Sequence, residues 1–257
     1  MTEALIEIGD GSAGFDELQR KLVPLWQSIQ TMTQDEQTIV VVPSMTLDDP
    51  GWPGSVLQAY EERFLFLLLL LRQPRARLVY VTSQAVNPSV VDYYLDLLPG
   101  VIPSHARRRL FLVSPLDGSA RPLSEKLLER PRLLARIREL VLDPDRAHLV
   151  PFNTTELERD LALALGIPMY GADPRFFHYG TKTGCRRLFA ELGVRHPLGE
   201  EDLAEVGDVV EALARLRAER PAAAQAIVKL NEGVSGEGNA SVDLRGLPTA
   251  GSDGERL

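Results

Sequence analysis

The chain has 257 residues, 44% of them hydrophobic, with 36 acidic against 28 basic side chains and a formal net charge of −8. A chain of this length can bury a sizeable core, and its negative charge disfavours broad electrostatic attraction to nucleic acid or to an anionic membrane, so we expect neither as a partner. The single cysteine, Cys185, excludes an internal disulfide, and we expect a cytoplasmic protein.

The first part of the chain alternates helical and strand patterns. Apolar residues at helical spacing predict helices over residues 15–29, 56–71, 89–98 and 124–142, the last interrupted at Pro131. Short apolar runs predict buried strands over residues 38–42, 78–81, 110–113 and 149–152. Such strands between helices predict an α/β fold, a doubly wound, mainly parallel, Rossmann-like sheet over residues 1–175.

Two details of these helices can be predicted more closely. Thr155 with Glu158 has the spacing of a capping box and predicts the start of a helix that ends at Leu165, and Ser89 with Asp92 has the same spacing. The apolar run over residues 64–71 is far shorter than the ~20 residues that cross a bilayer, so we interpret it as part of a buried helix.

A second unit is expected after Pro174, because the order of elements changes there. Helices over residues 182–192 and 203–216 follow one another without a strand between them, and strands over residues 226–230 and 240–244 come next. This gives a unit over residues 176–245. Residues 246–257 contain three glycines and a proline, and we expect them to form a flexible tail.

A glycine motif at the start of the chain is a weak candidate for a dinucleotide site. Gly9, Gly11 and Gly14 follow the apolar residues 4–8 and precede the first helix, which is the context of a G-x-G-x-x-G fingerprint. The next strand, however, leads to Pro43 rather than to a carboxylate for the ribose. We therefore prefer to interpret these glycines as a flexible lead, and an NAD-linked oxidoreductase is the weaker alternative function.

The last third of the chain contains a better candidate for an anion site. An apolar strand places Lys229 near its end, and a glycine-rich loop follows it; the loop residues that could bind are Gly233, Ser235, Gly236 and Gly238. Glycines allow backbone N–H groups to approach phosphate oxygens, and the lysine supplies a compact positive charge. A solvated hairpin whose glycines only form the turn explains the same pattern.

A second lysine makes the functional interpretation stronger. Lys182 stands at the start of a predicted helix, 47 residues before Lys229 (229 − 182), in the sequence HYGTKTGCRR. A lysine at a helix start faces the same way as the free N–H groups there, so both can meet an anion.

Together the phrases LFAELGVRHPLG and IVKLNEGVSGEG, with the lysine that opens the preceding helix, resemble the ATP-grasp superfamily. The resemblance extends backward through VPFNTTELERDLALALGIPMYGADPRF to peptide ligases of the pheganomycin type and related carboxylate–amine ligases. It implies a pre-ATP-grasp domain over residues 1–175 and the first part of an ATP-grasp fold over residues 176–245.

The same resemblance implies roles for residues and a reaction. Lys182 and Lys229 would contact the phosphates of ATP, and Gly233, Ser235, Gly236 and Gly238 would form the loop that closes over them. In such ligases ATP phosphorylates a small carboxylate substrate, and an amine or peptide nucleophile attacks the acyl phosphate to form an amide. No individual catalytic residue is assigned.

The chain departs from the family pattern at its end. ATP-grasp enzymes hold Mg²⁺ with acidic residues and an asparagine on later strands, and Asp253 and Glu255 lie in the glycine-rich tail. We therefore expect no metal ligands in this chain, Mg²⁺ ligands beyond its end, and a truncated protein that is inactive alone. The alternative is a non-catalytic module that binds a nucleotide or a partner chain.

Overall fold

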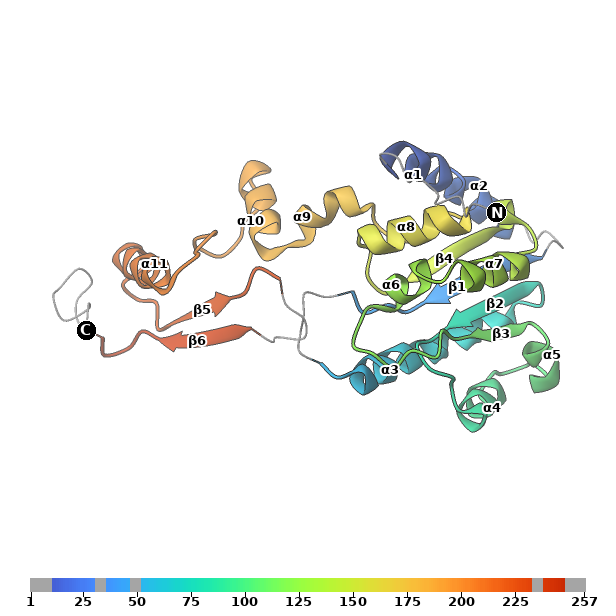
Figure 1. Ribbon diagram of the computed structural model, residues 1–257. Helices are drawn as coiled ribbons and strands as arrows, with labels where there is room; N and C mark the ends of the chain where they lie inside the picture. Colours follow the sequence, from blue (N-terminus) through green and yellow to red (C-terminus); the bar gives the residue numbers. More distant parts are fainter. Residues whose placement is uncertain (1–10, 31–35, 47–51, 233–237, 248–257) are drawn as a thin grey trace. The chain divides into compact units, whose positions relative to one another are not determined.

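The structure is a computed structural model that describes residues 11–30, 36–46, 52–232 and 238–247. The chain divides into two compact units, Met1–Pro174 and Arg175–Leu257 (Figure 1). Each unit is described by itself below.

The first unit is built around a four-stranded parallel sheet with the strand order β3-β2-β1-β4. The strands are β1 (Gln37–Val42), β2 (Ala76–Val81), β3 (Leu110–Val113) and β4 (Ala147–Pro151). In register, Val40 lies between Val79 of β2 and Leu149 of β4. The α/β class and the parallel sheet predicted from the sequence are confirmed.

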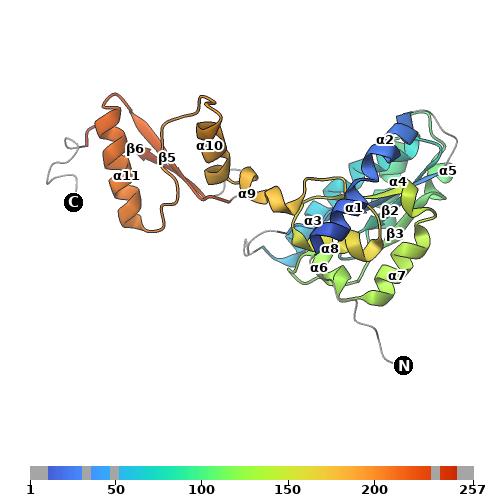
Figure 2. The same cartoon turned by 90° about the horizontal axis from the view of Figure 1, so that it is seen from above.

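Helices cover both faces of this sheet, as Figures 1 and 2 show. Alternate residues of each strand enter opposite cores: Val40 and Val79 pack with helices on one face, whereas Ile39 and Tyr80 pack on the other. The first core receives apolar residues from α1 (Gly11–Gln19), α6 (Leu123–Leu128), α7 (Pro131–Leu140) and α8 (Glu156–Leu165). The second receives them from the 3₁₀ helix η1 (Phe64–Arg72), α4 (Pro88–Asp96) and α5 (Pro103–Arg107). Each face of the sheet therefore has a core of its own.

The helix expected over residues 15–29 is two helices, α1 and α2 (Leu22–Gln30). The reason is Pro24, which has no N–H and whose ring would clash with a helical carbonyl four residues earlier. Proline is tolerated in the first turn of a helix, and Pro24 is the third residue of α2. The helical pattern is therefore interrupted and begins again at Leu22.

Two glycines of the motif near the chain start lie in a helix. Gly11 and Gly14 lie inside α1, so our interpretation of them as a flexible lead is wrong, while Gly9 and residues 4–8 lie outside the described residues. A Cβ added at Gly14 would meet a methyl group of Leu163 at 3.3 Å, so this glycine lets α1 pack closely on α8. Packing thus explains Gly14 without a nucleotide.

The apolar run at residues 64–71 is a 3₁₀ helix rather than the end of one long α-helix. The α-helix α3 (Gly54–Arg63) ends where η1 begins. A 3₁₀ helix has three residues per turn, and Leu65, Leu68 and Leu71 are accordingly the buried residues of η1. In the part of the chain that the structure describes, no helix is long and apolar enough to cross a membrane.

Two predictions of helix starts had opposite outcomes. The capping box of Thr155 and Glu158 at α8 is confirmed. The expected cap at Ser89 is wrong, because Asn87 caps α4 instead: its side-chain oxygen accepts a hydrogen bond from the N–H of Ser89 at 2.9 Å, and Pro88 is the first helical residue. Proline is favoured at that position, since the N–H it lacks would be unpaired there.

A buried polar network lies at the end of β2 and was not predicted. The Ser83 N–H and hydroxyl both donate to the carboxylate of Glu61, at 2.6 and 2.7 Å, and the Lys126 ammonium donates to the Ser83 hydroxyl at 2.9 Å. All three residues are at most 2% exposed. Burial raises the pKa of Glu61 and lowers that of Lys126, and each charge partly offsets the shift of the other.

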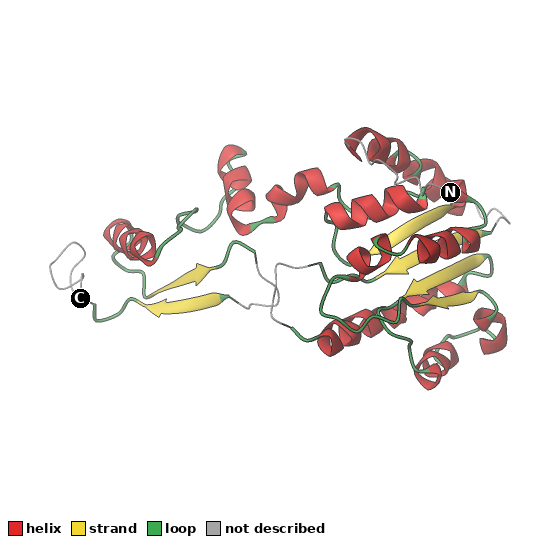
Figure 3. Ribbon diagram, viewed as in Figure 1, coloured by secondary structure: helices red, strands yellow, loops and turns green. Residues whose placement is uncertain are grey.

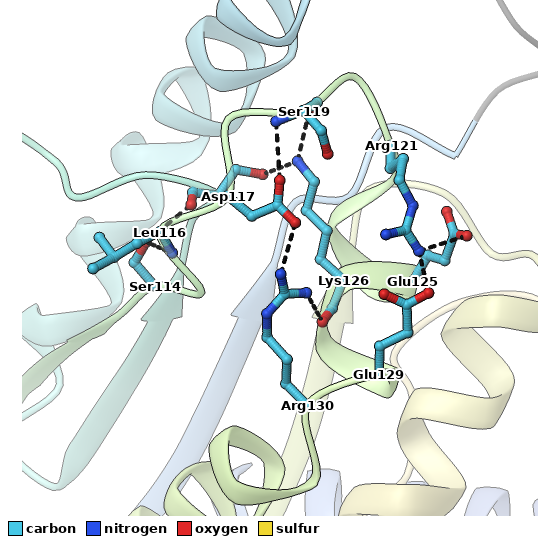
Figure 4. Close-up of polar contacts among 10 residues, drawn as sticks. Ser114, Leu116, Asp117, Ser119, Arg121, Glu125, Lys126, Glu129 and Arg130 are labelled. Carbon is cyan, nitrogen blue, oxygen red and sulfur yellow. Dashed lines mark hydrogen bonds and ion pairs between the residues drawn. The ribbon is translucent and has the colours of Figure 1, made fainter.

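The loop between β3 and α6 closes this network (Figure 4). Lys126 also donates to the carbonyl of Ser119 at 2.7 Å, and the guanidinium of Arg130 donates to Asp117 at 2.7 Å. Hydrogen bonds from Ser119, with a smaller effect of Arg130, lower the pKa of Asp117 to about 2. The loop is therefore fixed to α6 at several points.

In its described residues, the second unit has two longer helices and one hairpin. After the 3₁₀ helix η3 (Pro174–Phe176), its elements are α9 (Phe177–Gly180), α10 (Lys182–Glu191), α11 (Val206–Glu219) and the antiparallel strands β5 (Gln225–Lys229) and β6 (Asn239–Asp243). The helices and strands expected here are confirmed, except that α11 begins three residues late. Glu205 caps α11, with Asp208 completing a capping box.

An aromatic cluster attaches α2 to the sheet around a buried histidine. The ring of His148, in β4, lies 5.3 Å from the ring of Trp26 and 6.4 Å from that of Tyr170, measured between centroids. His148 is 3% exposed, and its Nδ1 has no hydrogen-bond partner among the described residues. Burial lowers its pKa from 6.5 to about 4.

His148 should make the fold sensitive to acid. Because its pKa is lower in the folded than in the unfolded chain, the unfolded chain takes up the proton first as the pH falls below 6.5. We expect the free energy of unfolding to fall by roughly 2 kcal/mol between about pH 7 and about pH 5 from this residue alone. Urea unfolding of His148→Phe should lack this part of the pH dependence. An exposed control, His105→Gln, should retain it, and an unchanged pH profile in His148→Phe would contradict the assignment.

Removal of the buried ammonium should be costly. Lys126→Met leaves the Glu61 carboxylate without its cation in a buried site, and we expect a loss of about 3 kcal/mol in the free energy of unfolding. Arg132→Met, which removes an exposed charge from α7, should change it by less than about 0.5 kcal/mol. Combining Lys126→Met with Glu61→Gln should recover part of the loss. Equal stabilities of Lys126→Met and the wild type in urea unfolding would refute the coupling.

Candidate functional site

The start of α10 is fixed by the residues around Lys182. The hydroxyl of Thr181, the N-cap residue, accepts from the N–H of Gly184 at 3.0 Å and donates to the carbonyl of His178 at 2.9 Å. A Cβ on Gly184 would lie 1.8 Å from that carbonyl oxygen. The sequence Thr-Lys-Thr-Gly therefore allows a tight entry to the helix and makes Lys182 its first residue.

The hairpin places Lys229 at the end of β5. Lys229 pairs with Asn239 across the hairpin, and the N–H of Leu230 donates to the carbonyl of Gly238 at 2.9 Å, which closes the base of the loop. Gly238 has φ +73°, a left-handed conformation that favours glycine. The strands are drawn in Figure 3.

The two faces of the hairpin differ. Alternate side chains of a strand point to opposite faces, and Ala226 is buried whereas Ile227 is 62% exposed. Lys229 shares the exposed face with Ile227 and is itself exposed. The lysine therefore points away from the buried face of its own unit.

Asn231 joins the two lysine segments. Its side-chain oxygen accepts from the N–H of Thr183 at 2.9 Å, and its backbone carbonyl accepts from the N–H of Lys182 at 3.3 Å and from the Lys182 ammonium at 3.4 Å. Asn231 lies two residues after Lys229. The end of β5 and the start of α10 are thus in direct contact, although they are far apart in sequence.

Arginine holds α10 to the segment that follows it. The guanidinium of Arg186 pairs with Glu201 and donates to the carbonyls of Pro197 and Gly199, at 2.9 and 3.1 Å. In α11, Arg215 contacts both carboxylate oxygens of Glu200, at 2.6 and 2.7 Å. The connection between the two helices is therefore tied to both of them.

The structure describes only part of the expected site. Lys182, Lys229 and Gly238 are described, whereas Gly233, Ser235 and Gly236 lie outside the described residues. Our argument from free N–H groups at the start of α10 is wrong in one respect, since those of Lys182, Thr183 and Gly184 all have partners. The sequence analysis also missed Asn231, whose position between the second lysine and the glycine loop was the available signal.

Among the described residues, no group of three or more histidine, cysteine, aspartate or glutamate side chains could hold a metal ion. Asp253 and Glu255 lie outside the described part of the chain.

Comparisons with known proteins connect both units to other chains. Residues 176–253 match the family described as IQCH-like, ATP-grasp. The chain is 36% identical over 175 residues to L-propargylglycine–L-glutamate ligase of Streptantibioticus cattleyicolor, an alignment that covers 66% of this chain and 36% of the ligase. It is 29% identical over 251 residues to IQ motif-containing protein H of Danio rerio, covering 90% of this chain and 23% of that protein.

These matches confirm the resemblance to ATP-grasp ligases that the sequence indicated. The chain spans 36% of the length of the ligase and 23% of that of the other relative. No solved structure matches the chain.

Gly184 should not tolerate a side chain. In Gly184→Ala the new methyl group would overlap the backbone carbonyl of His178, so the helix start must shift, and we expect a loss of roughly 1–3 kcal/mol in the free energy of unfolding. Gly207→Ala is the matched control in α11, because nothing lies within 4 Å of its added Cβ. Thermal unfolding followed by circular dichroism measures both, and a Gly184→Ala protein as stable as the control would show that the entry to α10 is not constrained.

Proposed function

We propose, for a chain whose residues 176–253 match the IQCH-like ATP-grasp family, that Lys182 and Lys229 bind the phosphates of ATP in an ATP-dependent carboxylate–amine ligation. The observation that carries this proposal is the contact of Asn231 with the start of α10. This contact brings the end of the strand that bears Lys229 to the helix that begins with Lys182. Two ammonium groups on adjoining segments suit a triphosphate, which carries several negative charges.

The proposed reaction has two steps. A carboxylate oxygen of the first substrate attacks the γ-phosphorus of ATP, and the bond to the β-phosphate oxygen breaks to release ADP. The nitrogen of an amine then attacks the carbonyl carbon of the acyl phosphate, phosphate leaves, and the nitrogen loses a proton to give an amide. The ammonium groups of Lys182 and Lys229 would orient the triphosphate and offset its charge, which accounts for much of the catalysis in phosphoryl transfer.

The relative that is a ligase supports amino acids as substrates. Its name describes the joining of L-propargylglycine and L-glutamate. We infer that this protein likewise joins a small carboxylate to an amine, in the cytoplasm where ATP is available. Among the described residues there is no group of three or more histidine, cysteine, aspartate or glutamate side chains that could hold a metal ion, and no step is assigned through Mg²⁺.

A second candidate is a module that binds a nucleotide or a partner without turnover. The alignment with IQ motif-containing protein H covers 90% of this chain, against 66% for the alignment with the ligase. ADP release in the presence of ATP, Mg²⁺, an amino-acid carboxylate and an amine separates the two candidates, because only a ligase releases ADP in a substrate-dependent manner.

ATP should protect the wild-type chain against thermal unfolding, since a ligand that binds only the folded state stabilises it. Lys182→Ala and Lys229→Ala should each weaken ATP binding roughly tenfold or more, because a charge-assisted hydrogen bond contributes about 1.5–3 kcal/mol. Lys21→Ala is the matched control, since Lys21 pairs with Asp145 at 2.7 Å in the first unit. The same loss of protection in all three variants, or no protection of the wild type, would overturn the proposal.

A further inference from the structure

The first turn of α10 has three backbone N–H groups that no residue of the helix itself can pair. In this protein they have partners: the carbonyl and side-chain oxygens of Asn231 accept from Lys182 and Thr183, and the Thr181 hydroxyl accepts from Gly184. An anion near this helix start therefore does not find free amides. It must be held mainly by the ammonium groups.

Two lysines hold one triphosphate only if their distance is set. Lys182 is the first residue of α10, so its backbone position follows the start of that helix. Lys229 is fixed in the hairpin by its pairing with Asn239 and by the adjoining bond from Leu230 to Gly238. Among the described residues, the hydrogen bonds between these two segments are those of Asn231.

We infer that Asn231 is a positioning residue, which fastens the end of β5 to the start of α10 and so sets the spacing of Lys182 and Lys229. The inference rests on the proposed function, because it concerns how the same two lysines bind phosphate. Asn231 acts through both of its oxygens: the side chain holds the helix at Thr183, and the backbone carbonyl orients the Lys182 ammonium. It need not touch the nucleotide.

A capping residue alone would explain the contact between Asn231 and Thr183, and the chain offers a control for that role. Thr181 caps the same helix with a hydrogen bond of similar length, 3.0 Å against 2.9 Å, but its two side-chain contacts stay within residues 178–184. Both Asn231→Ala and Thr181→Ala should lower the stability of α10. Only Asn231→Ala should separate the hairpin from the helix.

The test is calorimetric titration of the full chain with ATP and, separately, with inorganic tripolyphosphate, at a temperature well below unfolding. We expect Asn231→Ala, which removes the side-chain hydrogen bond to Thr183 and keeps the backbone carbonyl, to raise Kd for both ligands roughly fivefold to tenfold, the effect of one lost hydrogen bond. Thr181→Ala should change Kd less than about twofold. In a Lys182→Ala background, Asn231→Ala should have a much smaller effect, because the pair of ammonium groups is already gone.

The outcomes separate the two proposals. If the wild type binds and the lysine variants do not, but Asn231→Ala binds like the wild type or like Thr181→Ala, then positioning by Asn231 is overturned and the proposed function stands. If the wild type binds neither ligand, or binds as well without either lysine, both fall. A selective loss in Asn231→Ala supports both.

Discussion

The parallel sheet of the first unit is buried on both faces, so its strands are mostly apolar, with Thr38 and His148 as buried polar exceptions, and other polar side chains gather at the edge where the strands end. Polar residues do follow each strand there; they are Ser44 and Thr46 after β1, Ser83 after β2, Ser114 after β3, and Asn153 and Thr155 after β4. They bind one another across the strands. Thr46, for example, donates through its N–H to Asn153 and through its hydroxyl to the buried carboxylate of Glu158. In open α/β sheets a ligand often binds where strand order reverses, here between β1 and β4, but these groups already satisfy each other at that point.

The second unit depends on a different kind of interaction. Among its described residues the buried hydrophobic ones are Ala212, Ala226 and Leu244, while large side chains such as Ile227 and Leu230 are more than 60% exposed. So small a core cannot fix the relative positions of two helices and a hairpin, since a two-stranded hairpin alone is marginally stable. Hydrogen bonds of Arg186, Arg215 and Asn231 therefore determine much of the geometry around Lys182 and Lys229.

Sequence alone could predict the features that depend on neighbouring residues. The four strands, the interruption at Pro131 and the capping box of Thr155 with Glu158 all follow from local pattern. The 3₁₀ helix η1 could not be separated from an α-helix, because every residue from Phe64 to Leu71 is apolar and the pattern marks no buried face. The Glu61–Ser83–Lys126 network joins residues 22 and 43 positions apart, and Asn231 contacts residues 48 and 49 positions earlier. Local sequence patterns do not reveal contacts between residues so far apart. The prediction of Lys182 and Lys229 as a pair therefore could not show that Asn231 connects their two segments.

The use of lysine and arginine in this chain is unequal, and the difference has a physical meaning. The sequence has 24 arginines and four lysines. Arginines make the fixed, forked contacts, as Arg109 does with the carbonyls of Leu71, Gln73 and Ala76, each at 2.7 Å. A guanidinium suits such planar sites, whereas an ammonium is a compact charge on a flexible stem that can follow a ligand. Lys21 is ion-paired and Lys126 is buried, so the remaining two lysines, Lys182 and Lys229, are those on the segments that Asn231 joins. Lysine at both positions, in a chain that otherwise prefers arginine, fits a mobile polyanion better than it fits a structural ion pair.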